Sequence, residues 1–104
     1  MPKRTEIDFK SKEEIERYRE DVVRNKGKIS ILIWDKKKEK YIRVADPVFH
    51  SNDGVKVRMF KLRLGNTGIY DMKKTRFQRL KGIEGSKLVF EDIEGDELEA
   101  LRKL

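Results

Sequence analysis

The hydrophobic pattern of the chain changes period at Gly27, and this change limits the possible folds more than any other feature. Before it, Ile15, Tyr18 and Val22 recur at the spacing of one helix face. After it, short β-branched and aromatic runs alternate with turn residues, with no helical pattern between them until close to the C-terminus. Strands without helical crossovers pair mainly antiparallel, so the sequence predicts an α+β fold with one antiparallel sheet.

Two helices are expected, one on each side of the strand-rich region. The first is predicted from about Lys12 to Lys26, because Ser11 opens a capping-box pattern and Gly27 can adopt the left-handed conformation that ends a helix. Residues 5–9 alternate in polarity and predict a short extended lead-in. A second capping pattern at 96–99 predicts a short C-terminal helix.

Five to six short strands are expected between the helices. The stretch 55–64 changes the phase of its apolar residues at Met59 and Phe60, as a bulged or bent strand does when both of its faces become buried. We therefore expect a small antiparallel curved sheet or a partly open SH3/Sm-like barrel, with a pleckstrin-homology-like barrel as the alternative. The expected strands are 29–34, 41–45, 55–64, 69–72, 76–80 and 87–90.

The composition is that of one small charged domain. A chain of 104 residues suffices for a single domain over residues 1–104 and is too short for two. Charged residues make up 43%, against about 25% in ordinary domains. The abundance of Lys and Glu with few amides and no Cys predicts a thermophilic source. No apolar run approaches the roughly 20 residues of a membrane span, and no signal peptide is recognised, so no membrane association and a cytoplasmic location are expected.

The net charge of +7 is distributed unevenly along the chain. Residues 1–35 carry nine basic and eight acidic side chains, a net of +1. Residues 36–81 carry fourteen basic and four acidic side chains, a net of +10, and residues 82–104 carry three and seven, a net of −4. The positive excess therefore lies on the predicted sheet and its loops, which is typical of proteins that bind nucleic acid.

The sequence predicts a non-enzymatic protein that binds DNA or RNA mainly through phosphate contacts from a basic sheet face. Trp34 and Tyr41 flank a basic turn, where bases could stack on their rings. Alternatives are a protein-interaction or ligand-sensing regulatory module, a homodimer, or a basic face that only solvates the sheet. The candidate nucleic-acid-binding residues are Lys36, Lys37, Lys38, Lys40, Arg43, Lys56, Arg58, Lys61, Arg63, Lys73, Lys74, Arg76 and Arg79.

No catalytic, metal or cofactor site is expected. The only histidine, His50, lies in one short loop with Ser51 and Asp53, whereas the members of a catalytic triad converge from separate segments. One histidine and no cysteine exclude a structural zinc site. The acidic run at 91–97 lacks the spacing of a calcium loop, and we expect it to complement the basic segment within the molecule or across a dimer.

Three elements of residues 29–83 form a pattern seen in one family of small barrels. They are an opening strand with an aromatic residue (Ile31–Trp34), a Pro-Val step (Pro47–Val48), and a closing aromatic and arginine stretch (Phe77–Leu80). With these elements the segment faintly resembles the WYL-type Sm-like barrel modules, which are regulatory domains that sense ligands or nucleic acid. The family's Trp-Tyr-Leu is absent, and Val57–Lys61 stands in its place. The resemblance implies a small barrel but not membership of the family.

Overall fold

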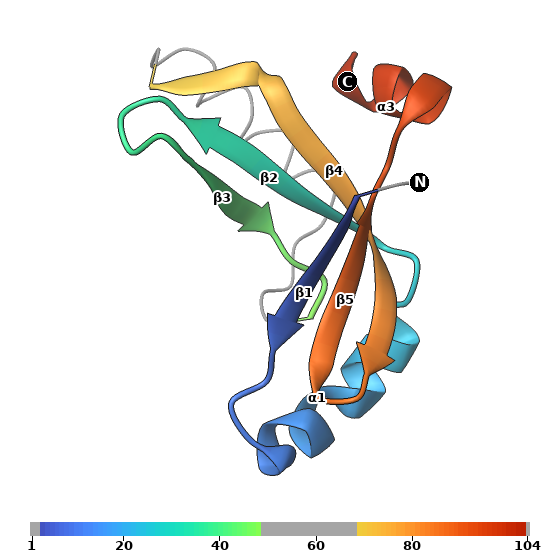
Figure 1. Cartoon of the computed structure of the whole chain (residues 1–104). Coiled ribbons are helices and arrows are strands. Elements are labelled where there is room, and N and C mark those ends of the chain that lie inside the picture. The colour runs from blue at the N-terminus through green and yellow to red at the C-terminus, as the bar shows by residue number, and fades with distance from the viewer. Residues whose placement is uncertain (1–2, 49–68, 104) are drawn as a thin grey trace.

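The computed structural model describes residues 3–48 and 69–103, which form a curled antiparallel sheet of five strands and two helices (Figure 1). The strand order is β1-β5-β4-β2-β3, and every neighbouring pair is antiparallel. The predicted α+β class with a curved, barrel-like antiparallel sheet is thus confirmed. The elements are β1 (Arg4–Asp8), α1 (Lys12–Arg24), β2 (Ile29–Asp35), β3 (Lys40–Ala45), β4 (Tyr70–Glu84), β5 (Lys87–Asp92) and α3 (Gly95–Arg102).

Strand β4 produces the curl, because it runs through both halves of the sheet. Its first part pairs with β2 and its second part pairs with β5. One bulge shifts the β2–β4 register between Leu32 and Trp34 of β2. Another shifts the β4–β5 register between Leu80 and Gly82 of β4. Bulges increase the local twist of a strand. Gly82 has a φ of +138°, which a residue with a side chain rarely adopts, so glycine suits this bulge.

The expectation of two separate elements at 69–72 and 76–80 is wrong. The structure has one strand of 15 residues, and the turn expected around Gly82 and Gly85 is confined to Gly85 and Ser86. Residues 72–75 lie in the irregularity of the β2–β4 register, between the pairs Trp34–Asp71 and Leu32–Arg76, and the paired residues on either side make β4 one continuous strand.

Each face of the sheet has its own apolar core. One core, the α1 cluster, packs α1 against β4 and β5 and includes Val22, Leu80 and Phe90, all nearly or fully buried. The other core, the α3 cluster, contains Ile31 and Phe77, and α3 packs its leucines against it. The register alternates between the two faces, so β4 supplies side chains to both cores.

Helix α1 begins as the sequence predicts and ends two residues early. The Ser11 Oγ accepts a hydrogen bond from the backbone N–H of Glu14 at 3.2 Å, which confirms this cap. The helix ends at Arg24, and Gly27, with a φ of +88°, donates its N–H to the Leu80 carbonyl on β4. The capping pattern predicted at residues 96–99 is wrong, because α3 starts at Gly95 and its N-cap, Glu94, makes no side-chain capping bond.

Some predictions concern residues that the structure does not describe. The expected strand 55–64, with its change of phase, and the loop around His50 both lie outside the described residues. Among the helices at 12–24 and 95–102, neither is long and apolar enough to cross a membrane.

Candidate nucleic-acid interface

The turn between β2 and β3 holds several of the predicted lysines at one end of the sheet. Asp35 is buried, and its Oδ1 accepts hydrogen bonds from the backbone N–H groups of Lys37 and Lys38, each at 2.9 Å. This arrangement closes the turn with the acidic side chain directed inward. The lysine side chains at 36, 37, 38 and 40 are all exposed.

The start of β4 adds two more predicted lysines to this end of the sheet. The backbone N–H of Lys36 donates to the Ile69 carbonyl at 2.9 Å, and Trp34 is opposite Asp71 in the β2–β4 register. Lys73 and Lys74 follow shortly after and are exposed. We call the six lysines from the two segments the basic hairpin end: Lys36, Lys37, Lys38, Lys40, Lys73 and Lys74.

The two predicted stacking residues lie beside the basic hairpin end and contact each other. The rings of Trp34 and Tyr41 meet edge to face with centroids 5.1 Å apart. The Lys74 ammonium lies 4.6 Å from the Trp34 ring centroid, and the Arg76 guanidinium lies 5.1 Å from that of Tyr41. The Tyr41 hydroxyl also donates to the Lys74 carbonyl at 3.0 Å. Each ring thus has a cation over one face.

Arg43 does not belong to an outward-facing patch, contrary to the sequence prediction. Its guanidinium donates to Ser30 Oγ and, at 2.9 Å, to Gln78 Oε1, and it lies 4.2 Å from the Phe90 ring centroid. Burial lowers the pKa of Arg43, an effect that the nearby carboxylate of Asp46 opposes. The Arg43 side chain therefore makes its contacts on the face of the sheet that carries the α1 cluster, where Ser30 and Gln78 are fully buried.

Arg76 is neutralised by a carboxylate of the acidic run. Its guanidinium binds Asp92 through two hydrogen bonds of 2.9 and 2.7 Å, and both side chains are mostly buried. The hydrogen bond to Asp92 raises the pKa of Arg76. Burial would raise the pKa of Asp92, but hydrogen bonds from Arg76 and Gln78 outweigh it and lower that pKa.

The next two cations along β4 also have acidic partners, although these two pairs are more exposed than Arg76 and Asp92. Arg79 donates to Glu97 on α3 and to the Gly27 carbonyl at 2.9 Å, and Lys81 lies 3.8 Å from Glu91. The prediction that the acidic run complements the basic segment within the molecule is confirmed for these pairs and for Arg76. The predicted basic group on β4 is therefore divided into exposed lysines at its start and paired cations further along.

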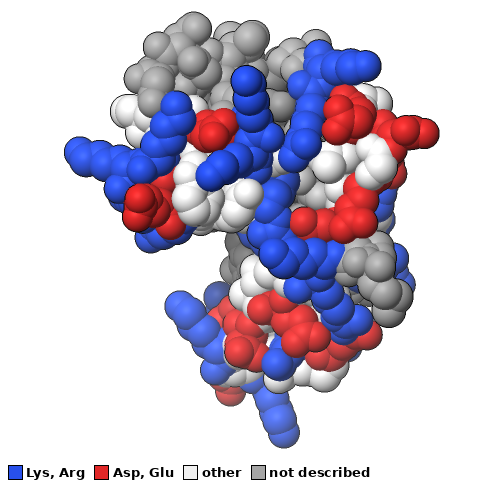
Figure 2. All heavy atoms as spheres, turned by 45° about the horizontal axis from the view of Figure 1, so that its top comes forward, with Lys and Arg blue, Asp and Glu red and all other residues white. Residues whose placement is uncertain are grey.

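Figure 2 shows how the charges of the described residues lie on one face of the molecule. Lys and Arg side chains project from the upper left of this view, where the β2–β3 turn lies, with a few Asp and Glu side chains among them. Asp and Glu side chains are interspersed with basic ones on the right and below, near the two helices. The predicted residues Lys56, Arg58, Lys61 and Arg63 lie outside the described residues.

Sequence reasoning did not identify Gln78, the chain's single glutamine, as the centre of a buried network. Its amide donates to Thr5 Oγ1 and Asp92 Oδ1, each at 2.8 Å, and accepts from Arg43. An isolated polar residue in a strand gives no sign of this role, because its partners come from three other strands. Within residues 3–48 and 69–103, no group of three or more His, Cys, Asp or Glu residues could hold a metal ion.

Comparisons of the chain with protein-family models, with curated proteins and with solved structures find no match. The resemblance of residues 29–83 to WYL-type modules therefore gains no support.

Proposed function

We propose that this chain is a non-catalytic protein that binds nucleic acid, chiefly through phosphate contacts made by the basic hairpin end. One observation carries the proposal. Six exposed lysines from two segments lie at one end of the sheet, and none of them forms an ion pair with a carboxylate of the described residues. The three cations further along β4, by contrast, each have an acidic partner.

The side chains involved suggest the mode of binding. Lysine ammonium groups act as point charges on flexible stems, so they contact phosphates and read little base sequence. Binding would release counterions from the nucleic acid, and we expect dissociation constants of about 10⁻⁴ to 10⁻⁶ M near physiological salt. Trp34 and Tyr41 support a second contribution, because a phosphate that draws Lys74 aside would leave a ring face open for a base.

The proposal also covers the type of barrel, the source of the protein and its location in the cell. The pronounced curl of the antiparallel sheet supports a partly open barrel of the SH3/Sm-like kind. The abundance of Lys and Glu supports a thermophilic source, and a cytoplasmic location remains a prediction.

A salt series tests the proposal and counts the phosphate contacts. We expect binding of a labelled DNA or RNA oligonucleotide in gel shifts to weaken about 500-fold between 50 and 200 mM salt if five lysines bind. The triple substitution Lys37→Gln, Lys38→Gln and Lys73→Gln should reduce the magnitude of the log–log slope by about 3, since each lost phosphate contact removes about 0.9.

A matched control variant distinguishes binding at the basic hairpin end from a general effect of the net charge of the protein. The triple substitution Lys10→Gln, Lys12→Gln and Lys28→Gln removes the same charge at exposed positions around α1 and before the start of β2, away from the basic hairpin end. It should leave the slope unchanged. Equal losses in both triple variants, or no shift of the wild-type chain at 50 mM salt, would overturn the proposal.

A further inference from the structure

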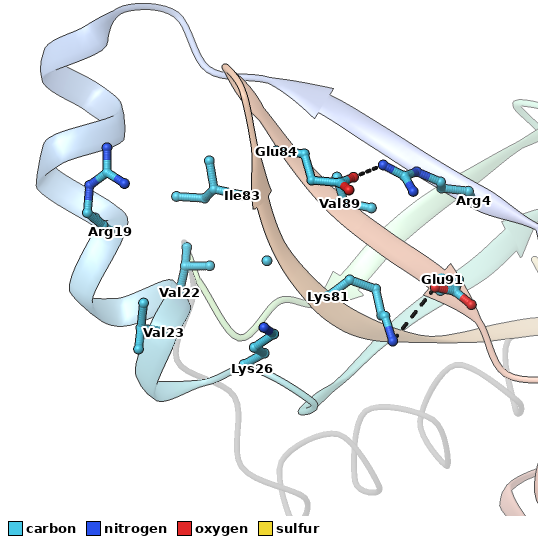
Figure 3. A pocket seen from close by; sticks show the side chains of 11 residues that line it. Arg4, Arg19, Val22, Val23, Lys26, Lys81, Ile83, Glu84, Val89 and Glu91 are labelled. Carbon is cyan, nitrogen blue, oxygen red and sulfur yellow. Dashed lines mark ion pairs between the residues drawn. The ribbon is translucent and has the colours of Figure 1, made fainter.

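A groove of about 480 Å³ lies between the second half of α1 and the bent β4–β5 hairpin (Figure 3). We call it the α1 groove. It lies at the α1 end of the sheet, whereas the basic hairpin end is at the far end of β2 and β3 (Figure 1). Pockets of about 300–1,000 Å³ accommodate drug-sized ligands, so this groove has room for one or two partner side chains.

The floor and mouth of the α1 groove are apolar. Val22 and Val89 line the floor and are nearly fully buried, whereas Val23 at the mouth is 70% exposed. Ile69, the other exposed large apolar residue of the described chain, reaches only 45%. Gly82 leaves the floor open, because a Cβ there would meet only the Lys26 Cε, at 3.9 Å. An apolar side chain that entered the groove would remove Val23 from water.

The strand side of the α1 groove is electrically balanced. Glu84 pairs with Arg4, and Glu91 lies 3.8 Å from Lys81 (Figure 3). These carboxylates are thus already matched by cations of the same rim, and they offer little attraction to a basic ligand.

The helix side of the α1 groove carries one unmatched cation. Arg19 is paired with Glu16 on its own helix at 2.8 Å, whereas Lys26 is exposed and forms no ion pair with any described carboxylate. An incoming carboxylate would therefore meet the unmatched charge of Lys26, and the exposed Val23 lines the same groove. That combination fits an apolar side chain flanked by acidic ones.

We propose that the α1 groove docks an acidic, amphipathic segment of a partner protein. One apolar side chain of the partner packs against Val23 and the Gly82 backbone, and a neighbouring carboxylate binds Lys26. This interaction surface is separate from the proposed nucleic-acid interface, so either can exist without the other.

A defined peptide tests the docking. The probe is a capped hexapeptide of two leucines flanked on each side by two glutamates, titrated into the full-length chain and followed by amide ¹H–¹⁵N chemical shifts. We expect saturable shifts at Val22, Val23, Lys26 and Gly82. A peptide with lysines in place of the glutamates, and another with serines in place of the leucines, should each bind at least about fivefold more weakly.

Exposed positions provide the variants, so the fold should be retained. Val23→Ser and Lys26→Glu should each raise the dissociation constant of the acidic peptide at least about fivefold. Lys12→Glu makes the same charge change at the opposite end of α1 and should leave it unchanged. Shifts confined to the basic hairpin end, equal binding of the serine peptide, or equal effects of Lys12→Glu and Lys26→Glu would each refute the docking while leaving the nucleic-acid proposal intact.

Discussion

At the scale of single residues, the buried polar network around Gln78 explains why some predicted binding residues are unavailable to a ligand. Gln78 bridges Arg43 on β3 and Asp92 on β5, and Asp92 in turn binds Arg76. Burying charged groups is unfavourable unless they are paired and hydrogen-bonded, and here both conditions are met. No sequence pattern could reveal this network, since Thr5 and Gln78 are 73 residues apart and meet only through the sheet register.

Removal of the Asp92 charge should destabilise the fold. Asp92→Asn leaves the largely buried guanidinium of Arg76 without its counter-charge, and we expect the free energy of unfolding to fall by about 2 kcal/mol. Denaturant titration measures this change. Glu84→Gln breaks an exposed pair with Arg4 and should cost less than about 1 kcal/mol. A cost for Asp92→Asn no larger than that of Glu84→Gln would show that the network does not stabilise the fold.

The same carboxylate predicts a pH dependence. Because folding lowers the pKa of Asp92, the folded state binds its proton less readily than the unfolded state does, and the ionised group stabilises the fold. This stabilisation is complete above the ordinary aspartate value of 3.8 and is lost as the pH falls through the lower folded value. The difference in unfolding free energy between wild type and Asp92→Asn should therefore shrink below about pH 4. A constant difference from pH 7 to pH 2 would contradict this assignment.

At the scale of elements, the sequence is most informative where local patterns and tertiary pairing agree. The α1 cap at Ser11 and the strand predicted at 29–34 follow from local residues and are found in the structure. The length of β4 was not predictable, because Lys73 and Lys74 interrupt its apolar pattern and only the pairing of the residues on either side of them with β2 and β5 defines one strand. The candidate site shows the same limit. The lysine-rich turn could be predicted from the sequence. The ion pair between Arg79 and Glu97 could not, because it forms only when α3 lies on the sheet.

The Ser11 cap should have a measurable effect on stability. Ser11→Ala removes the acceptor for the Glu14 N–H and should lower the free energy of unfolding by about 1 kcal/mol. Ser11→Asp retains an acceptor and favours the positive end of the helix, so it should be close to neutral. Equal losses in the two variants, measured by chemical denaturation, would indicate that the cap bond contributes little.

At the scale of the whole molecule, β4 joins the two cores into one structure. Phe77 belongs to the α3 cluster and Leu80 to the α1 cluster, although they are only three residues apart on the same strand. Loss of packing in the core on one face of β4 should therefore also destabilise the core on the other face. We expect the chain to unfold as a single cooperative unit.

Substitutions in each core test this coupling. Phe77→Leu should cost about 1.5 kcal/mol and Leu80→Ala about 2–5 kcal/mol, and in both variants far-UV and tryptophan signals should report one shared transition. Two separated transitions in either variant would show that the cores unfold independently.

The Lys74 ammonium above the Trp34 ring has a practical consequence. This indole is the only one in the chain, and a positive charge close to it affects the energy of its excited state. An anion that draws the ammonium away alters the electric field at the fluorophore. The protein thus contains its own optical reporter for occupancy of the basic hairpin end, and it needs no added dye.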